Sequence, residues 1–328
     1  MFPISTPSGE QIQIPASIDE DNPYFAPDQP NEAADYYNRE GYVVIRGCAP
    51  AEACDAAREA FEKKIKRYPD YLYRQTGGNP EKNRFNDRSF VMNPILNVQD
   101  VPTASLGDFR VKALHTICNA NTRNFLRYVF EEEPKLVQSM YFEGNSQTWP
   151  HQDTYYLDSE KIGTMVAAWY AVEDIQPGAG RFFVYPRSHL IDLGKNGGDF
   201  DVAFNHARYK KLIVDIIRDH KLECRAPALK KGDVLFWNAR TIHGSLETRQ
   251  PEFSRSSLTA HFIPLSHRFL QFQSRIKKLN NVEFEGWAVH QPKSLDRLGS
   301  RAVLFFETRF PKSFQRAKWL AVKMLVTH

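Results

Sequence analysis

The chain has 328 residues, of which 42% are hydrophobic, and a formal net charge of +4. This length supports a substantial core in one large domain or two modest ones, and no run reaches the eighteen or so apolar residues of a membrane-spanning helix. The first residues lack the basic and apolar segments of a secretory signal and the four cysteines are widely scattered, so we expect a cytoplasmic protein with reduced thiols.

Charge is distributed unevenly along the chain. From Leu265 to the end, 12 Lys and Arg stand against 4 Asp and Glu, a balance of +8, and the other 31 basic and 35 acidic residues give −4. A basic C-terminal segment could face a phosphate-bearing substrate, an acidic carrier protein or an anionic membrane surface. The plain alternative is a solvated face that keeps the protein soluble. We expect no nucleic-acid partner.

The N-terminal third is predicted to be helical around one short strand. Residues 1–30 are rich in Pro, Asp and Asn without periodicity, which indicates an extended arm. Residues 31–69 predict a helix, the strand "YVVIRG" and a second helix that starts after Pro50. Residues 70–100 are rich in Gly, Asn and Arg and indicate a long loop, either functional or poorly ordered, followed by a helix at about 106–130.

From Leu136 onward, short β-branched and aromatic runs separated by Gly, Pro and Asp predict strands. These runs are "LVQSMYFE", "GTMVAAWYAVED", "GRFFVYP", "GDVLFWNAR" and "RSSLTAHFIP", with a helical insert at roughly 199–221. Many short strands with helices outside predict a mainly β fold with flanking helices, a double-stranded β-helix or cupin-like jelly roll. We expect this domain to span 31–265, including the helical N-terminal part, with a basic extension at 266–328 packing on or beside it.

The stretch "TWPHQDTYYLDSE" places His151 and Asp153 two positions apart. In an extended strand such residues point to the same face, whereas Gln152 turns away. The strand "GDVLFWNAR" leads into "TIHGS", which places His243 just past a strand end, at the mouth of a barrel. Two histidines and one carboxylate with open positions suit Fe(II) and leave room for O2 and a co-substrate. We therefore predict His151, Asp153 and His243 as iron ligands.

Iron centres of this kind use a 2-oxo acid as electron source, and the far carboxylate of 2-oxoglutarate requires a fixed cation. Arg255 lies twelve residues after His243, on the next predicted strand. Its planar guanidinium suits a bidentate carboxylate contact better than a lysine would. Ser245, two residues after His243, could add a hydroxyl donor to the same carboxylate.

The segment "HQDTYYLDSEKIGTMVAAWYAVEDIQPGAGRFFVYPRSH" resembles the core of the phytanoyl-CoA dioxygenase family of Fe(II)/2-oxoglutarate oxygenases. In that family the HxD motif precedes a Trp-bearing strand, a Gly-rich turn and a Pro-x-Ser/Thr-His sequence. With "NREGYVVIRG", which resembles the family's opening strand, the likeness covers about residues 30–265. The resemblance implies that His151, Asp153 and His243 are iron ligands and that Arg255 and Ser245 contact 2-oxoglutarate. It also implies that Gln138 and Trp169 line the co-substrate pocket. Arg181 departs from the family pattern, which often has proline or a small residue there.

The resemblance implies an oxidoreductase that takes Fe(II), 2-oxoglutarate and O2. We expect hydroxylation of an unactivated C–H bond in a small-molecule or carrier-linked substrate, in a biosynthetic pathway. Retention of Asp153, which related halogenases replace by a small residue, favours hydroxylation; desaturation or ring closure by the same oxidant is the alternative. Two other classes remain open. A zinc metallohydrolase could use the same ligands without a role for Arg255, and a cupin-like protein could bind without catalysis.

Candidate substrate contacts are Tyr155, after the HxD motif, and Arg74 and Asn93 in the long loop, which would cap the barrel mouth and could recognise an anionic substrate. A core position is the alternative for Tyr155, and a solvated loop for the other two. His261 alternates with Arg255 along its strand and could face the site, although a packed strand histidine is the reading we favour. The sequence does not identify the substrate.

The last eighteen residues, "PKSFQRAKWLAVKMLVTH", combine apolar and basic side chains. A helix lying on a membrane, which would imply a lipid-linked substrate, and a docking site for a carrier are two interpretations. Because the apolar residues nearly encircle the helix, packing within the fold or in a dimer is favoured. We expect a monomer or a homodimer.

Overall fold

The largest sheet has eight strands, in the order β17-β18-β7-β14-β10-β12-β3 with β6 paired to β7. Neighbours are antiparallel except β18 and β7, which run parallel. Its strands are β3 (Tyr42–Ile45), β6 (Ile95–Leu96), β7 (Pro134–Phe142), β10 (Val166–Ala171), β12 (Val234–Asn238), β14 (Ser257–Pro264), β17 (Asn281–Phe284) and β18 (Trp287–His290). The structure is a computed structural model and describes the whole chain except residues 22, 194–204, 274, 315 and 318–328.

Two three-stranded sheets and two hairpins complete the β structure. One sheet has the order β11-β13-β8 and the other β16-β15-β9, while β1 pairs with β2 and β4 with β5. The bounds are β1 (Phe2–Ser5), β2 (Gln11–Ile14), β4 (Leu72–Tyr73), β5 (Pro80–Glu81), β8 (Thr148–His151), β9 (Leu157–Ser159), β11 (Phe182–Val184), β13 (His243–Ser245), β15 (Phe269–Gln271) and β16 (Arg275–Lys277).

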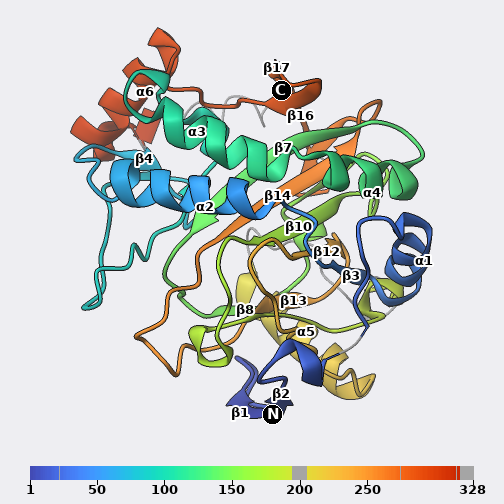
Figure 1. Cartoon of the computed structure of the whole chain (residues 1–328). Coiled ribbons are helices and arrows are strands. Elements are labelled where there is room, and N and C mark those ends of the chain that lie inside the picture. The colour runs from blue at the N-terminus through green and yellow to red at the C-terminus, as the bar shows by residue number, and fades with distance from the viewer. Residues whose placement is uncertain (22, 194–204, 274, 315, 318–328) are drawn as a thin grey trace.

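Helices cover one face of the large sheet (Figure 1). They are α1 (Pro30–Glu40), α2 (Ala51–Ala60), α3 (Thr103–Ile117) and α4 (Ala120–Phe130), whereas α5 (His206–Asp219) contacts β8 and α6 (Leu298–Arg309) contacts β5. A π turn at Phe61–Ile65 extends α2, and 3-10 turns lie at Ile18–Glu20, Val98–Asp100, Asp153–Tyr155, Pro177–Ala179 and Ser188–Leu190. Among the described residues, no helix is long and apolar enough to cross a membrane.

Strand β10 shows how the two faces of the large sheet are used. Val166, Ala168 and Tyr170 belong to the cluster shared with the helices, whereas Ala167 and Trp169 belong to a second cluster between the sheets. A strand covered on both faces is apolar throughout, and all six residues of β10 are buried. The predicted mainly β fold with flanking helices is confirmed, and its interior is the space between the large sheet and β11-β13-β8.

Two local predictions need correction, and one helix was not predicted. The N-terminal arm contains the β1–β2 hairpin, with a turn at Gly9. The single helix expected at 106–130 is two helices. Helix α3 ends at Ile117, and the side chain of Asn119 accepts a hydrogen bond from the backbone N of Thr122, which caps the start of α4. Helix α6 was not assigned from the sequence. Part of the predicted insert at 199–221, and most of the predicted C-terminal helix, lie outside the described residues.

Candidate metal centre

The three predicted iron ligands meet where two strands of the small sheet pair. His151 is the last residue of β8 and is the register partner of His243, the first residue of β13. Asp153 does not continue the strand; it begins a 3-10 turn after Gln152, whose backbone is extended. The predicted same-face arrangement thus arises from a strand end and a turn. Gln152 points elsewhere, and its side-chain amide donates to the carbonyl of Arg240.

The ligand atoms of the three side chains lie within 4.8 Å of one another, the one such group of His, Cys, Asp or Glu among the described residues. Asp153 Oδ1 is 3.5 Å from His243 Nε2 and 3.7 Å from His151 Nε2. The other ring nitrogens donate to backbone carbonyls: His151 Nδ1 to Trp149 at 2.8 Å, and His243 Nδ1 to Thr241 at 2.9 Å. Because a carbonyl can only accept, Nδ1 carries the proton and Nε2 keeps its lone pair for a metal.

Burial and charge favour the protonation states that a metal site needs. Burial, and then the neighbouring His243, lower the pKa of His151 to about 4, so this imidazole is neutral at pH 7. Burial opposes ionisation of Asp153, but the adjacent His243 and His261 more than offset it and hold the pKa of Asp153 well below its usual range. Two imidazoles and one carboxylate therefore face one point, which is the donor set that suits Fe(II).

The second carboxylate oxygen of Asp153 is held by groups outside this triad. Trp237, on β12, donates from its indole nitrogen to Oδ2 at 2.9 Å. His261 Nε2, on β14, lies 3.5 Å from the same oxygen, and its Nδ1 is buried without a hydrogen-bond partner. Oδ2 is thus engaged by protein donors while Oδ1 faces the histidines. Such partners orient a ligating carboxylate and fix which oxygen meets the metal.

Arg255 is a buried cation with no counter-ion in the described part of the chain. Its guanidinium donates from Nη1 to the carbonyl of Gly180 at 3.0 Å, its Nε has no hydrogen-bond partner, and no ion pair forms with a carboxylate of the described residues. The rings of Phe142 and Trp169 lie 5.5 and 5.9 Å from it. Burial lowers the pKa of Arg255 to about 10, which still leaves it charged at neutral pH. A buried, unpaired guanidinium is costly unless a ligand supplies the anion, and it matches a carboxylate of 2-oxoglutarate.

An aromatic wall joins Arg255 to the metal ligands. The ring of Phe182, on β11, stacks on His243 at 5.4 Å and lies 4.6 Å from Trp237. It also lies 6.2 Å from Trp169, the residue that contacts the Arg255 guanidinium. The triad and the free cation therefore belong to one interior, at two ends of the same wall.

Ser245 and Gln138, two other residues predicted to lie at the 2-oxoglutarate site, are held by contacts within the sheets. The Ser245 hydroxyl accepts from the backbone N of Thr148 at 2.8 Å and donates to Asn145 at 3.1 Å, so it holds β13 against the start of β8. Gln138, on β7, is the register partner of His261 and shares its face of the sheet.

The three residues predicted to contact substrate are engaged in contacts within the protein. Tyr155 is buried and packs on Tyr209 at 4.1 Å, whereas Tyr156 lies 6.1 Å from His151. Arg74 is fully buried; it donates to the carbonyls of Glu81 and Asn93 and to the side chain of Asn83. The buried Asn93 side chain bonds to residues 81–84. Arg74 and Asn93 therefore fold the long loop onto itself, because their polar atoms are engaged within it and are not offered to a substrate.

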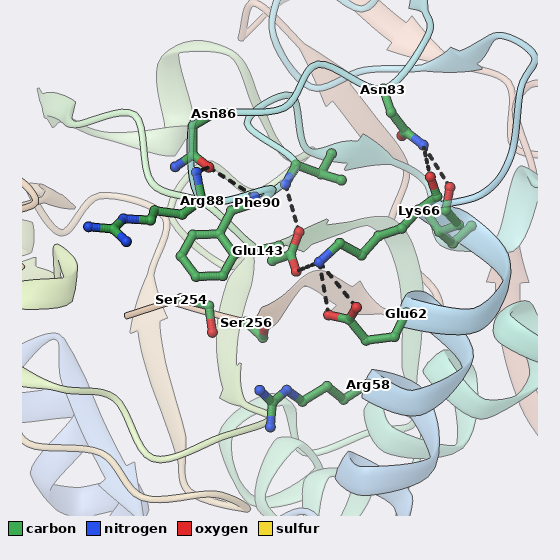
Figure 2. A network of polar contacts seen from close by, with 12 residues as sticks. Arg58, Glu62, Lys66, Asn83, Asn86, Arg88, Phe90, Glu143, Ser254 and Ser256 are labelled. Atoms are coloured by element: carbon green, nitrogen blue, oxygen red, sulfur yellow. Dashed lines mark hydrogen bonds and ion pairs between the residues drawn. The ribbon is translucent and has the colours of Figure 1, made fainter. Parts of the chain in front are cut away.

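Figure 2 shows how this loop is attached to the barrel. The buried carboxylate of Glu143, directly after β7, accepts from the backbone N of Val91 in the loop and from Lys66 Nζ, each within 2.7 Å. Lys66 also pairs with Glu62 after α2. The backbone carbonyl of Glu143 accepts from the N of Arg255 at 2.8 Å. The loop, the helical segment and the residues just before β14, which include Arg255, are thus joined at Glu143.

An open cavity of about 530 Å³ lies beside this network, away from the metal ligands. Its residues include Arg58, Phe90, Glu173, Lys231 and Ser254. Both cations are neutralised within the chain, Arg58 by Glu173 at 3.1 Å and Lys231 by Asp55 at 2.8 Å. Neither cation is therefore free to bind an anionic ligand, in contrast to Arg255.

Trp237 and Phe182 were not predicted, and His261, for which a packed strand position was favoured over one facing the site, lies 3.5 Å from Asp153 Oδ2. Trp237 occurs in the strand pattern "LFWN", where it alternates with the buried Leu235. Alternation indicates that the two share a face, but which strands lie beside each other is set by long-range pairing. Arg181, the departure from the family pattern, donates to the carbonyls of Pro15 and Ile175 and so anchors the N-terminal arm.

Comparison with known proteins gives one family. Residues 37–256 match the family model described as phytanoyl-CoA dioxygenase (PhyH). A Danio rerio relative, phytanoyl-CoA dioxygenase domain-containing protein 1, is 23% identical over 262 residues, 69% of this chain and 87% of the relative. A Bos taurus protein of the same name is 22% identical over 264 residues, with the same coverage of both chains.

Solved structures share the fold. The 2-oxoglutarate-dependent carbocyclase SnoK from nogalamycin biosynthesis aligns with a TM-score of 0.54 and 17% identity, over 76% of this chain and 89% of its own. The epimerase SnoN, in complex with Fe3+ and 2-oxoglutarate, aligns at 0.52 and 18%, over 81% and 97%. EctD from S. alaskensis, with 2-oxoglutarate and 5-hydroxyectoine, aligns at 0.52 and 15%, over 87% and 92%.

Proposed function

Since the chain belongs to the phytanoyl-CoA dioxygenase family, we propose that it hydroxylates an unactivated C–H bond of a small organic substrate. Family and site together make it a dioxygenase of the iron- and 2-oxoglutarate-dependent class. One observation supports the proposal above the others. The three-ligand site and the buried, unpaired guanidinium of Arg255 stand at two ends of one aromatic wall.

The residues have distinct roles in this proposal. His151, Asp153 and His243 would hold Fe(II), and Arg255 would hold the far carboxylate of 2-oxoglutarate. Trp169 and Gln138 would line the co-substrate pocket, and Ser245 would reach the carboxylate only by releasing its bond to Asn145. When bound, iron and 2-oxoglutarate supply the oxidising chemistry with O2. The chain contributes orientation and exclusion of water, because the side chains of Asp153, His243 and Arg255 are buried.

Hydroxylation is favoured because Asp153 fills its ligand place and both of its oxygens are engaged. Desaturation or ring closure by the same oxidant is the second candidate, and the carbocyclase and epimerase among the neighbours make it worth testing. A zinc hydrolase or a non-catalytic binding protein would not explain the buried guanidinium of Arg255. We expect a biosynthetic substrate, free or linked to a carrier, that approaches past Tyr156 beside His151.

The test is a screen for substrate-dependent succinate release with Fe(II), 2-oxoglutarate and O2, across acyl thioesters, amino acids, sugars and lipid-linked sugars. Mass spectrometry of the product separates the outcomes: hydroxylation adds one oxygen atom, whereas desaturation and ring closure remove two hydrogens. An Asp153→Ala variant is the matched control and should release no succinate above background. Substrate conversion that proceeds without O2 or 2-oxoglutarate would contradict the proposal.

A further inference from the structure

Helix α6 turns an apolar face toward solvent. Five large apolar side chains of α6 and the residue after it are between 43% and 79% exposed: Leu298, Val303, Phe305, Phe306 and Phe310. Leu298, Phe305 and Phe306 are spaced i, i+7, i+8, and Val303, Phe306 and Phe310 are spaced i, i+3, i+7, so they gather on one broad side. Figure 1 shows α6, in orange-red, at the edge of the molecule. A contiguous exposed apolar surface of this kind marks an interaction site.

The opposite side of α6 already has its partners. Leu304 packs against the main core, and Glu307 is buried, where it accepts from the hydroxyl of Tyr73 at 3.2 Å. The helix is therefore packed against the domain through this side, while its apolar side remains exposed.

The charge on the exposed side has one sign. Arg297, Arg301, Arg309 and Lys312 are basic, and none of them forms an ion pair with the part of the chain that the structure describes. Glu307, the single acidic residue of α6, is buried on the other side. The exposed side thus combines phenylalanine rings with uncompensated cations, which is the composition of a helix that lies in a lipid interface.

We infer that α6 is an interfacial helix that docks the protein on an anionic lipid surface. The phenylalanine rings enter the boundary between headgroups and acyl chains, and the basic side chains meet lipid phosphates. A second copy of the chain fits this face poorly, because a two-fold contact would bring the same unpaired arginines together without an acid between them. The inference rests on α6 alone and is independent of the proposed reaction.

The test is co-sedimentation of the full chain with vesicles of phosphatidylcholine alone, and of phosphatidylcholine and phosphatidylglycerol in equal amounts. We expect binding to the anionic vesicles that weakens as salt is raised. Arg301→Gln with Arg309→Gln should weaken it by roughly fivefold per charge removed. Phe305→Ser with Phe306→Ser should abolish it.

Matched pairs elsewhere serve as controls. The variant Phe85→Ser with Phe253→Ser removes two exposed rings outside α6, and the variant Arg67→Gln with Arg88→Gln removes two exposed cations outside it. Neither variant should change binding to the vesicles. Unchanged thermal melting of the α6 variants shows that they fold. Failure to bind anionic vesicles, or binding that survives both pairs of α6 substitutions, would overturn the inference. So would a dimer in solution that Phe305→Ser with Phe306→Ser dissociates, because the face would then join two copies.

Discussion

The indole nitrogen of Trp237 donates a hydrogen bond of 2.9 Å to Oδ2 of Asp153. The two residues are far apart in sequence and meet because the chain just after β12 lies against the turn that begins at Asp153, where the backbone N of Thr154 donates to the carbonyl of Ala239 at 3.1 Å. The bond leaves Oδ1 to face His151 and His243. Trp237 is thus a positioning residue for the carboxylate that would bind iron.

Replacing Trp237 with Phe removes the N–H and keeps most of the ring. We expect Fe(II) affinity, measured by anaerobic competition titration, to fall by roughly tenfold, because the carboxylate loses the donor that orients it. Trp149→Phe is a matched control, since its indole nitrogen is buried without a hydrogen-bond partner. Equal Fe(II) affinity of the Trp237→Phe protein and the unaltered protein would remove this role.

Replacing Arg255 with Met should have opposite effects with and without ligand. In the absence of 2-oxoglutarate we expect the free energy of unfolding to rise by about 1 kcal/mol, because an unpaired buried charge is removed. In the unaltered protein, 2-oxoglutarate at a hundred times its Kd adds about 2.7 kcal/mol, and the variant should lose this gain. Urea unfolding with and without the co-substrate measures both quantities.

The control for that experiment is the other buried arginine of this region. Arg181 donates to two backbone carbonyls, so Arg181→Met should lower the free energy of unfolding by about 2 kcal/mol and keep the response to 2-oxoglutarate. If Arg255→Met destabilises the free protein and still responds to 2-oxoglutarate, Arg255 has a structural role and does not bind the co-substrate.

The Lys66–Glu143 pair (Figure 2) should contribute far more stability than the exposed pair formed by Lys63 and Glu59. Lys66→Met leaves the buried Glu143 carboxylate with only the Val91 N–H, and we expect unfolding to become easier by about 2 kcal/mol. Adding Glu143→Gln should restore part of the loss. Lys63→Met, which breaks an exposed pair with Glu59, should change stability by less than about 0.5 kcal/mol. Equal losses at Lys66 and Lys63 would contradict this ranking.

Asp100 should make the protein less stable as pH rises. Burial raises the pKa of Asp100 to about 7, although the backbone N of Lys293 donates to it. A carboxyl group with a raised pKa binds its proton more tightly in the folded state. Its contribution is therefore present below the unfolded pKa of about 4 and is lost as pH rises to about 7, by on the order of 1 kcal/mol per pH unit.

Asp100→Asn removes this titration. Urea unfolding at several pH values between about 5 and 7 should show a flatter dependence of stability on pH in the variant than in the unaltered protein. Parallel curves for the two proteins would show that Asp100 does not titrate in this range.

The sequence predicted those parts of the site that depend on local periodicity. Strands β10, β11, β12 and β14 lie within the runs predicted for them, and β7 overlaps its run but begins two residues earlier, at Pro134, because alternation and β-branched residues are local signals. The meeting of His151, Asp153 and His243 also followed from spacing and strand ends. What could not be predicted depends on which strands are neighbours. Trp237 and His261 reach Asp153 only through the order β14-β10-β12, which no local pattern contains.

The direction of side chains in turns and loops could not be predicted from the sequence either. Tyr155 and Tyr156 are adjacent in sequence, and only the 3-10 turn that begins at Asp153 decides which one enters the core. Likewise, the Arg and Asn residues of the long loop carried no sign that Arg74 and Asn93 would bond to the loop itself.

The most direct test of the central claim is the absorption spectrum of the protein with Fe(II) and 2-oxoglutarate under anaerobic conditions. We predict a weak visible charge-transfer band that requires both additions, saturates at one iron per chain and is absent from the His243→Ala protein. A featureless spectrum at saturating iron and 2-oxoglutarate would contradict the account and favour a hydrolytic metal on the same three side chains.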